Sequence, residues 1–202
     1  MIEMTRSDAV TDPRTEAYLS RNTGRSTPLT VLSPMPRRWA WVLRLILAVR
    51  RSLGPSKDLQ RMSFIHFAHW VVITRFPGQQ RRSRYAYLLF RSDFNGSWAK
   101  YIDAFSLEIP KRMALIWGWS FGFPGALPPE PFRGYIAGND LPVDHYFSAY
   151  PESGVNEIAA ALRVKKAYDE QLAEAGPDEF NAVWQRFAAE NQHDLYAWEA
   201  GK

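Results

Sequence analysis

The sequence contains no cysteine among its 202 residues. This absence excludes disulfide scaffolds, cysteine-ligated zinc, iron–sulfur clusters and thiol catalysis. It also lacks any apolar run of the ~18–20 residues that a membrane-spanning helix needs. No H-E-x-x-H, G-x-G-x-x-G or P-loop spacing occurs, so we expect no bound metal and no phosphate-cradling loop.

Acidic residues are scarce in the first half of the chain. Residues 1–100 carry 17 Lys+Arg and 6 Asp+Glu, whereas residues 101–202 carry 8 and 15, for an overall formal charge of +4. Such a split indicates an anionic partner for the first half, or attraction between the two halves within or between chains. With 46% apolar residues, the chain can build a core, and its length predicts one domain plus an appendage.

The N-terminal third divides into two segments. Residues 1–33 are polar and lack periodicity, which predicts a flexible, mobile arm. The start MIEMTRSDAV lacks the basic region and apolar stretch of a secretory signal, so we expect a cytoplasmic protein. Residues 34–55 predict a basic amphipathic helix that Pro36 opens and Gly54-Pro55 ends.

That predicted helix carries arginines around a face that contains Trp41, Leu45 and Val49. A helix of this kind docks on an anionic membrane surface as a peripheral anchor, or packs on its own domain or on a second subunit. The predicted surface-binding residues are Arg37, Arg38, Arg44, Arg50 and Arg51.

Residues 62–175 predict an α+β domain, followed by a C-terminal helical extension at 176–202. Residues 62–76 are apolar in both parities, which is typical of a central strand covered on both faces. The further expected elements are strands at 84–92 and 141–151 and helices at 98–117, 154–175 and 178–190. We expect an antiparallel sheet packed by helices, ferredoxin-like if residues 132–138 or a partner chain supply a fourth strand.

The runs SFIHFAHWVVI, YAYLLFRSDFNGSWAKYIDAF, LIWGWSFGFPGA and DHYFSAYP resemble a family of uncharacterised bacterial proteins over about residues 62–172. The resemblance implies a ferredoxin-like unit of the type that dimerises into an α+β barrel. Dye-decolourising peroxidases share that superfold, and their Gly-x-x-Asp-Gly signature is degenerate here. Ser92 replaces the first glycine and Asn95 the aspartate, which puts peroxidase chemistry in doubt.

Four histidines are candidates for binding or catalysis. His66 and His69 are three apart on a strand, so we expect them on opposite faces unless the strand is broken. One axial histidine suffices for haem, and His145 or His66 is the candidate. The aromatic segment Trp117–Pro131 can wall a pocket, form an interface or plug the end of the sheet. The predicted ligand-pocket residues, between the sheet and helix 98–117, are His66, Trp70, Trp117, Trp119 and His145.

Nucleic acid is not an expected partner. Arg81, Arg82 and Arg84 cluster on one loop, but no RNP, zinc-finger or helix-turn-helix signature appears. The sequence therefore favours a non-enzymatic interaction or scaffold protein that self-associates as a homo-oligomer and docks on an anionic membrane surface or a partner subunit. The alternative is a small-ligand or haem-binding, oxidoreductase-like protein of the dimeric α+β barrel type. The residues do not decide whether it is an enzyme.

Overall fold

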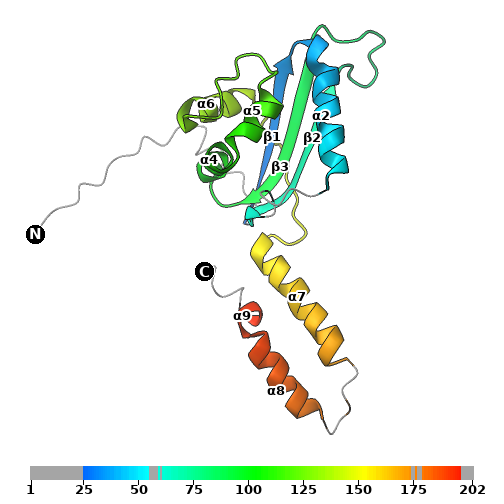
Figure 1. Cartoon of the computed structure of the whole chain (residues 1–202), viewed down its shortest axis with the longest axis vertical. Helices are drawn as coiled ribbons and strands as arrows, with labels where there is room; N and C mark the ends of the chain where they lie inside the picture. The colour runs from blue at the N-terminus through cyan, green and yellow to red at the C-terminus, as the bar shows by residue number, and fades with distance from the viewer. Residues whose placement is uncertain (1–24, 55–58, 60, 174–175, 177–178, 197–202) are drawn as a thin grey trace, which may run out of the picture.

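The structure is a computed structural model that describes residues 25–54, 59, 61–173, 176 and 179–196. Its centre is a three-stranded antiparallel sheet of β1 (Ser26–Met35), β2 (Ile65–Ile73) and β3 (Ala86–Asn95), in the order β1-β3-β2. Together with the helices on one side of the sheet, these strands confirm the predicted α+β class (Figure 1). β2 lies at an edge, so the prediction that it is a central strand is wrong.

β1 contradicts the predicted arm over residues 1–33. Residues 26–33 pair with β3 in continuous register, and Leu29 and Val31 are fully buried. Their alternation with outward Thr30 and Leu32 is that of a half-covered strand. Pro28 and Pro34 are tolerated because β1 is an edge strand. Residues 1–24 lie outside the described residues.

A helix does form within residues 34–55, but it is shorter than predicted. Pro34 and Met35 end β1, a 3₁₀ turn covers Arg37–Trp39, and α2 spans Ala40–Ser52. Ala40 and Leu43 of α2 are buried in the main core. Because β1 and β2 both run antiparallel to β3, they are parallel to each other and α2 is their crossover. The interpretation of this segment as an accessory to an independent 62–175 domain is therefore wrong.

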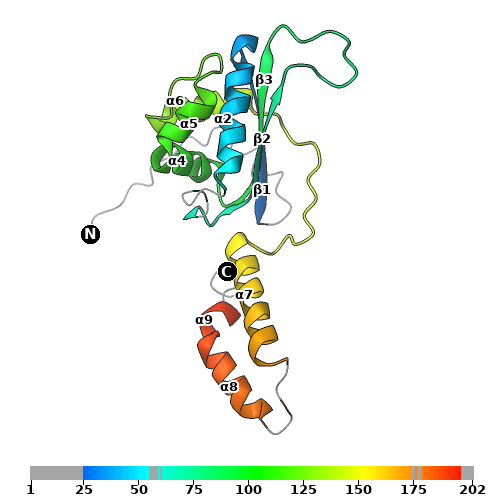
Figure 2. The same cartoon turned by 45° about the vertical axis from the view of Figure 1, so that its right-hand side comes forward.

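Three further helices lie on the same side of the sheet as α2: α4 (Trp98–Glu108), α5 (Pro110–Trp117) and α6 (Pro129–Asn139) (Figures 1 and 2). The Ser97 hydroxyl caps α4, and Pro110 opens α5, so this proline starts a new helix rather than kinking one continuous helix over residues 98–117. Asp103 of α4 accepts two hydrogen bonds, of 2.6 and 2.7 Å, from the Arg133 guanidinium of α6. These contacts fix a layer of helices over one face of the sheet.

Residues 132–138, one of the two alternatives for a fourth strand, do not supply it, because this segment lies in α6. Phe132, Tyr135 and Ile136 recur at helical spacing and all three are buried. Residues 141–151, predicted as a strand, contain no strand either. The only pairing that the described residues form at this edge of β1 is an isolated bridge between Val31 and Asp140.

A helical hairpin follows the segment 141–154: α7 (Val155–Gln171), α8 (Phe180–Glu190) and the short α9 (Gln192–Leu195). It projects from the sheet-and-helix body (Figures 1 and 2). Its own small core contains Ala160, Leu172 and Phe187, which are buried. The helical extension therefore begins with α7, at Val155, whereas the sequence predicts that it begins at residue 176.

Candidate functional site

The two faces of the sheet differ in what covers them. The covered face carries Leu88, Phe90 and Phe94 of β3 under the helices, and all three are buried. We call the opposite side the open face; its outward residues on β2 and β3 are Phe67, His69, Val71, Ile73, Tyr87, Leu89, Arg91 and Asp93. Figure 2 shows the sheet nearly edge-on, with the helices on one side and only loops on the other.

The sequence pattern of β2 is broken by a β-bulge that the sequence does not reveal. Ile65 pairs with Phe94, and Phe67 pairs with Asp93, so His66 is an extra residue in β2. The Ser92 hydroxyl donates to the Phe67 carbonyl at 2.9 Å and accepts from the Tyr101 hydroxyl at 2.5 Å. Burial raises the pKa of Tyr101 well above its ordinary value, so this hydroxyl stays protonated. A buried hydrogen-bond chain thus holds the bulge in place.

The bulge corrects the expectation that His66 and His69 face opposite sides. His66 lines a cleft together with Phe67, Arg91 and Asp93 of the open face. Asp93 is also close enough to His69 for their charges to interact. Within the described residues, however, no group of three or more His, Asp or Glu side chains could hold a metal ion.

Two ionisable side chains of this cleft, His66 and Asp93, have pKa values shifted by partial removal from water. Burial lowers the pKa of His66, against the opposing effects of a hydrogen bond with Asn95 and the charge of Asp93. Burial raises the pKa of Asp93, against the charges of Arg91, His66 and His69. His66 Nε2 and Asp93 Oδ1 are both buried without a hydrogen-bond partner in the described part of the chain. Neutral His66 and a more easily protonated Asp93 therefore share one wall.

The roof of the cleft comes from residues 146–153 and the first turns of α7, and the volume of the cleft is about 1050 Å³. The Tyr146 hydroxyl donates to the Ser26 hydroxyl at 2.9 Å, and Arg25 N–H donates to the Pro151 carbonyl at 2.8 Å. Asn95 Oδ1 accepts from the Val155 N–H at the start of α7, at 2.8 Å. These bonds fasten one end of the segment to the sheet, so the cleft has a fixed floor and roof.

Apolar side chains surround the mouth of the cleft. The aromatic or aliphatic lining residues with the largest exposed fractions are Phe67 at 70%, Phe147 at 77%, Tyr150 at 71% and Leu162 at 64%. A concave surface with this much exposed apolar area is typical of a binding site rather than of free solvent-facing surface.

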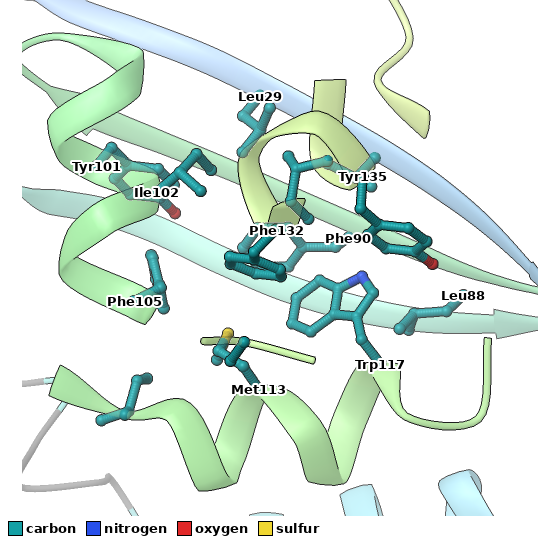
Figure 3. Close-up of a cluster of buried hydrophobic side chains, with 14 of the residues drawn as sticks. Leu29, Leu88, Phe90, Tyr101, Ile102, Phe105, Met113, Trp117, Phe132 and Tyr135 are labelled. Carbon is teal, nitrogen blue, oxygen red and sulfur yellow. The ribbon is translucent and has the colours of Figure 1, made fainter. Parts of the chain in front are cut away.

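The predicted ligand pocket between the sheet and helix 98–117 does not form. Figure 3 shows Trp117, Phe90 and Met113 converging in this layer, and Trp117 is only 1% exposed. The space left there is about 10 Å³, enough for no more than about one water molecule. Haem cannot occupy it.

The five predicted pocket residues are therefore scattered. Trp70 packs on Phe90 on the covered face, with ring centroids 5.3 Å apart. Trp119 packs against Trp39, beside α2, with centroids 4.9 Å apart. His145 is exposed in the segment 141–154. Only His66 reaches the cleft described above.

The aromatic segment after α5 contains a G-x-S-x-G spacing at Gly118, Ser120 and Gly122. In hydrolases this spacing marks an exposed serine on a strand–turn–helix elbow. Here the motif follows a helix and not a strand, and Ser120 is buried. The structural context of a nucleophile is absent, so the motif predicts no hydrolase.

The five predicted surface arginines all lie in the 3₁₀ turn or in α2, but their contacts differ. Arg44 donates to the Val72 carbonyl at 3.0 Å and to the Thr74 hydroxyl at 3.4 Å, which ties α2 to β2. The Arg38 guanidinium lies 5.6 Å from the ring centroid of Trp39. Arg37 lies in the same turn, and Arg50 and Arg51 lie in the last turn of α2.

Comparison with protein-family models, with curated proteins and with solved structures finds no match for this chain. The resemblance to a bacterial family and its barrel-forming superfold thus stays a prediction. Among the described residues, no helix is both long and apolar enough to cross a bilayer.

Proposed function

We propose that the protein is a non-enzymatic, self-associating interaction protein in which a second copy covers the open face of the sheet. One observation carries the proposal: the outward side of β2 is apolar although nothing in the described part of the chain covers most of it. Phe67 and Val71 are 70% and 43% exposed. An antiparallel strand with one solvated face normally alternates apolar and polar residues, and strands apolar in both parities are covered on both faces.

Charge favours a second copy over an unrelated partner. Arg91 and Asp93 are successive outward residues of the central strand β3. A two-fold interface places a patch against itself, so Arg91 of one copy can pair with Asp93 of the other. The open face is thus self-complementary in charge as well as apolar in its middle rows.

The topology supports the finer expectation of a ferredoxin-like unit. β1, α2, β2, β3 and α4 follow one another as the first five elements of the β-α-β-β-α-β arrangement, with β3 between the parallel strands. The sixth element would lie at the edge of β1 opposite β3, where the described residues form no strand and a single isolated bridge, between Val31 and Asp140. Two such sheets facing each other would make the expected dimeric α+β barrel.

Sedimentation velocity across a concentration series tests self-association. We expect the wild type to form a dimer and Val71→Glu to stay monomeric, because the new carboxylate would be buried unpaired in the interface. Leu45→Glu, on the outer side of α2, is the matched control and should still dimerise. A wild type that is monomeric at every concentration, or a Val71→Glu protein that dimerises equally well, would refute the proposal.

A second observation favours docking of α2 on an anionic membrane surface. A stripe on the outer side of α2 and just beyond it is apolar and exposed, and Arg44 and Arg51 lie along one flank. The helix contains no Asp or Glu. The stripe residues and their exposed fractions are Trp41 66%, Leu45 56%, Val49 50% and Leu53 70%. Apolar contact with the acyl boundary and arginine contact with headgroups would act together.

Vesicle co-sedimentation tests the docking. Wild type should bind phosphatidylserine-containing vesicles and not neutral phosphatidylcholine vesicles, and Leu45→Glu should abolish binding. Val71→Glu, which breaks the proposed dimer, should still bind at high protein concentration. Deletion of residues 34–55 is not a useful variant, because it removes buried Leu43 and the crossover helix. Equal binding of wild type and Leu45→Glu would contradict the docking.

A further inference from the structure

Six arginines lie together at the end of the sheet where β1 and β2 end and β3 begins. The register pairs Met35 with Ala86 and Ile73 with Tyr87, so the 3₁₀ turn after β1 and the connection 74–85 leave the sheet at the same end. In Figures 1 and 2 this end lies opposite the helical hairpin. The arginines of this surface, which we call the basic end, are Arg37, Arg38, Arg75, Arg81, Arg82 and Arg84.

The connection between β2 and β3 has a defined backbone. Gly78 has a φ of 78°, and the Gln79 N–H donates to the Phe76 carbonyl at 3.2 Å, which closes a turn. The Ser83 N–H donates to the Thr74 carbonyl at 3.2 Å, so the two sides of the connection meet again before β3 begins. All four arginines of the connection are exposed on this framework.

No acidic side chain of the described residues pairs with this charge. Residues 25–54, 59 and 61–92, which supply all six arginines, include no Asp or Glu. None of the six forms an ion pair within the described part of the chain. Part of the basic surplus of the first half is therefore concentrated at one end of the molecule. Attraction to an anionic surface would orient the molecule with this end toward it.

Exposed aromatic side chains lie among these arginines. Tyr85 and Phe121 are 38% and 46% exposed and meet edge-on, with ring centroids 5.4 Å apart. The Arg84 guanidinium lies 5.4 Å from the ring centroid of Tyr85. The Phe121 N–H donates to the Pro34 carbonyl at 2.9 Å, which holds the aromatic segment after α5 at this end of the sheet. Aromatic rings beside basic side chains are typical of surfaces that contact the headgroup region of a bilayer.

The basic end is continuous with the apolar stripe of α2. The guanidinium of Arg38 lies 5.6 Å from the ring centroid of Trp39, and the stripe begins two residues later at Trp41. The hydrogen bond of 3.4 Å from Arg44 to the Thr74 hydroxyl ties α2 to the first residue of the connection. This continuity favours a bilayer over nucleic acid, because a polynucleotide would leave the apolar stripe without a partner.

We infer that the basic end binds anionic lipids whose headgroup is a terminal phosphate monoester, as in phosphatidic acid, on the bilayer that α2 contacts. A guanidinium group donates two parallel hydrogen bonds to a phosphate, and a monoester carries more charge than a phosphodiester. The inference rests on the proposed docking for the contact with α2, and it adds a lipid class and a second contact. None of the six arginines is among the outward residues of the open face.

Vesicle co-sedimentation with the full-length protein tests the lipid class. Phosphatidic acid and phosphatidylserine vesicles are matched in zeta potential, and wild type should prefer phosphatidic acid. Arg81→Gln with Arg82→Gln should lower the affinity for phosphatidic acid vesicles about 25-fold, because each basic residue near the surface contributes roughly a factor of five. The preference should also disappear. Arg61→Gln with Arg186→Gln, before β2 and in α8, removes the same charge elsewhere and should bind as wild type does.

A fluorophore on the connection tests the second contact. Because the sequence has no cysteine, Gln80→Cys places a single label on an exposed residue of the connection. Ala182→Cys places the matched label on an exposed residue of α8, in the hairpin. The emission of an environment-sensitive fluorophore at residue 80 should shift to shorter wavelength on phosphatidic acid vesicles, and the emission at residue 182 should not change.

The outcomes separate the inference from the docking of α2. Equal loss-free binding by Arg81→Gln with Arg82→Gln, equal wild-type affinity for the two anionic vesicles, or unchanged emission at residue 80 would overturn the inference and leave the docking intact. Unchanged binding of Leu45→Glu, with loss in the arginine variant, would refute the docking of α2 and keep the basic end. No vesicle binding by wild type would refute both. Tighter binding to single-stranded RNA than to phosphatidic acid vesicles, lost in the arginine variant, would reassign the basic end to nucleic acid.

Discussion

The covered and open faces of the sheet are built from alternate residues of the same strands, yet the side chains of the two faces differ in burial. On β3, Leu88 and Phe90 are buried beneath the layer of helices, whereas outward Leu89 is only partly buried. On β2, Val72 is buried and its neighbour Val71 is 43% exposed. The described part of the chain therefore covers one face with a layer of helices and the other face only near His66, although both faces of the strands carry apolar residues.

The largest loss of unfolding free energy should come from a substitution on the covered face. Trp117→Ala removes a side chain that is 1% exposed and packs edge-on against Phe90. We expect it to lower the free energy of unfolding by about 3–5 kcal/mol, from lost transfer energy and the cavity left behind. Urea denaturation measures this. A cost below about 1 kcal/mol would show that the helix layer is not the core.

The second-largest loss of unfolding free energy should come from disrupting the β-bulge that turns His66 toward the open face. Ser92→Ala leaves the Tyr101 hydroxyl and the Phe67 carbonyl without their buried partner, at a cost of about 1–3 kcal/mol. The histidine NMR titration of His66 should also move toward its ordinary pKa as the strand relaxes. Lys100→Ala, a substitution at an exposed residue of α4, is the control and should leave both measurements unchanged.

Asp140 tests the edge of β1, where the two faces meet. Burial raises the pKa of Asp140 to about 7, despite hydrogen bonds from the Thr30 and Leu141 backbone. In the unfolded chain its pKa is about 3.9, so the folded state binds the extra proton and stability should fall as pH rises from about 4 to 7.

Asp140→Asn removes the titrating group at this edge. Its thermal midpoint should exceed that of wild type at pH 8 and match it more closely at pH 4. Identical pH profiles for the two proteins would mean that Asp140 is solvated.

The smallest effect on the folded monomer should come from the open face. Phe67→Ser truncates a side chain that is 70% exposed, so dilute protein should change its unfolding free energy by no more than about 0.5 kcal/mol. Urea denaturation at low protein concentration measures it. A loss comparable to that of Trp117→Ala would mean that the open face is already covered in the monomer.

Much of the architecture is legible in the sequence, for local reasons. The strands around Trp70 and Phe90, the cap at Ser97 and the restart at Pro110 follow from alternation, capping and proline chemistry. β1 is not predicted from the sequence, because Pro28, Pro34 and its hydroxyl residues are unfavourable in strands. Only long-range pairing with β3 stabilises this strand.

The candidate site is less predictable. His66 is among the residues that the sequence singles out, but the alternation of the strand places its side chain on the covered face, whereas the structure places it in the cleft of the open face. The bulge depends on a hydrogen bond from Ser92, 25 residues away, which leaves no mark in the local sequence. Similarly, the arginines of α2 can be identified in the sequence. The groove that Arg50 and Arg51 border, between α2, β2 and α5, forms only when the three elements pack side by side.

Hydroxyl-radical footprinting of Phe67, read by mass spectrometry, measures directly whether a second copy covers the open face. In concentrated wild-type protein Phe67 should be protected, and it should become reactive on dilution or in Val71→Glu. Trp41, on the outer side of α2, should react equally in all samples and serves as the internal reference. If Phe67 reacts as strongly in concentrated wild type as in Val71→Glu, the open face is free in solution and the proposed self-association is wrong.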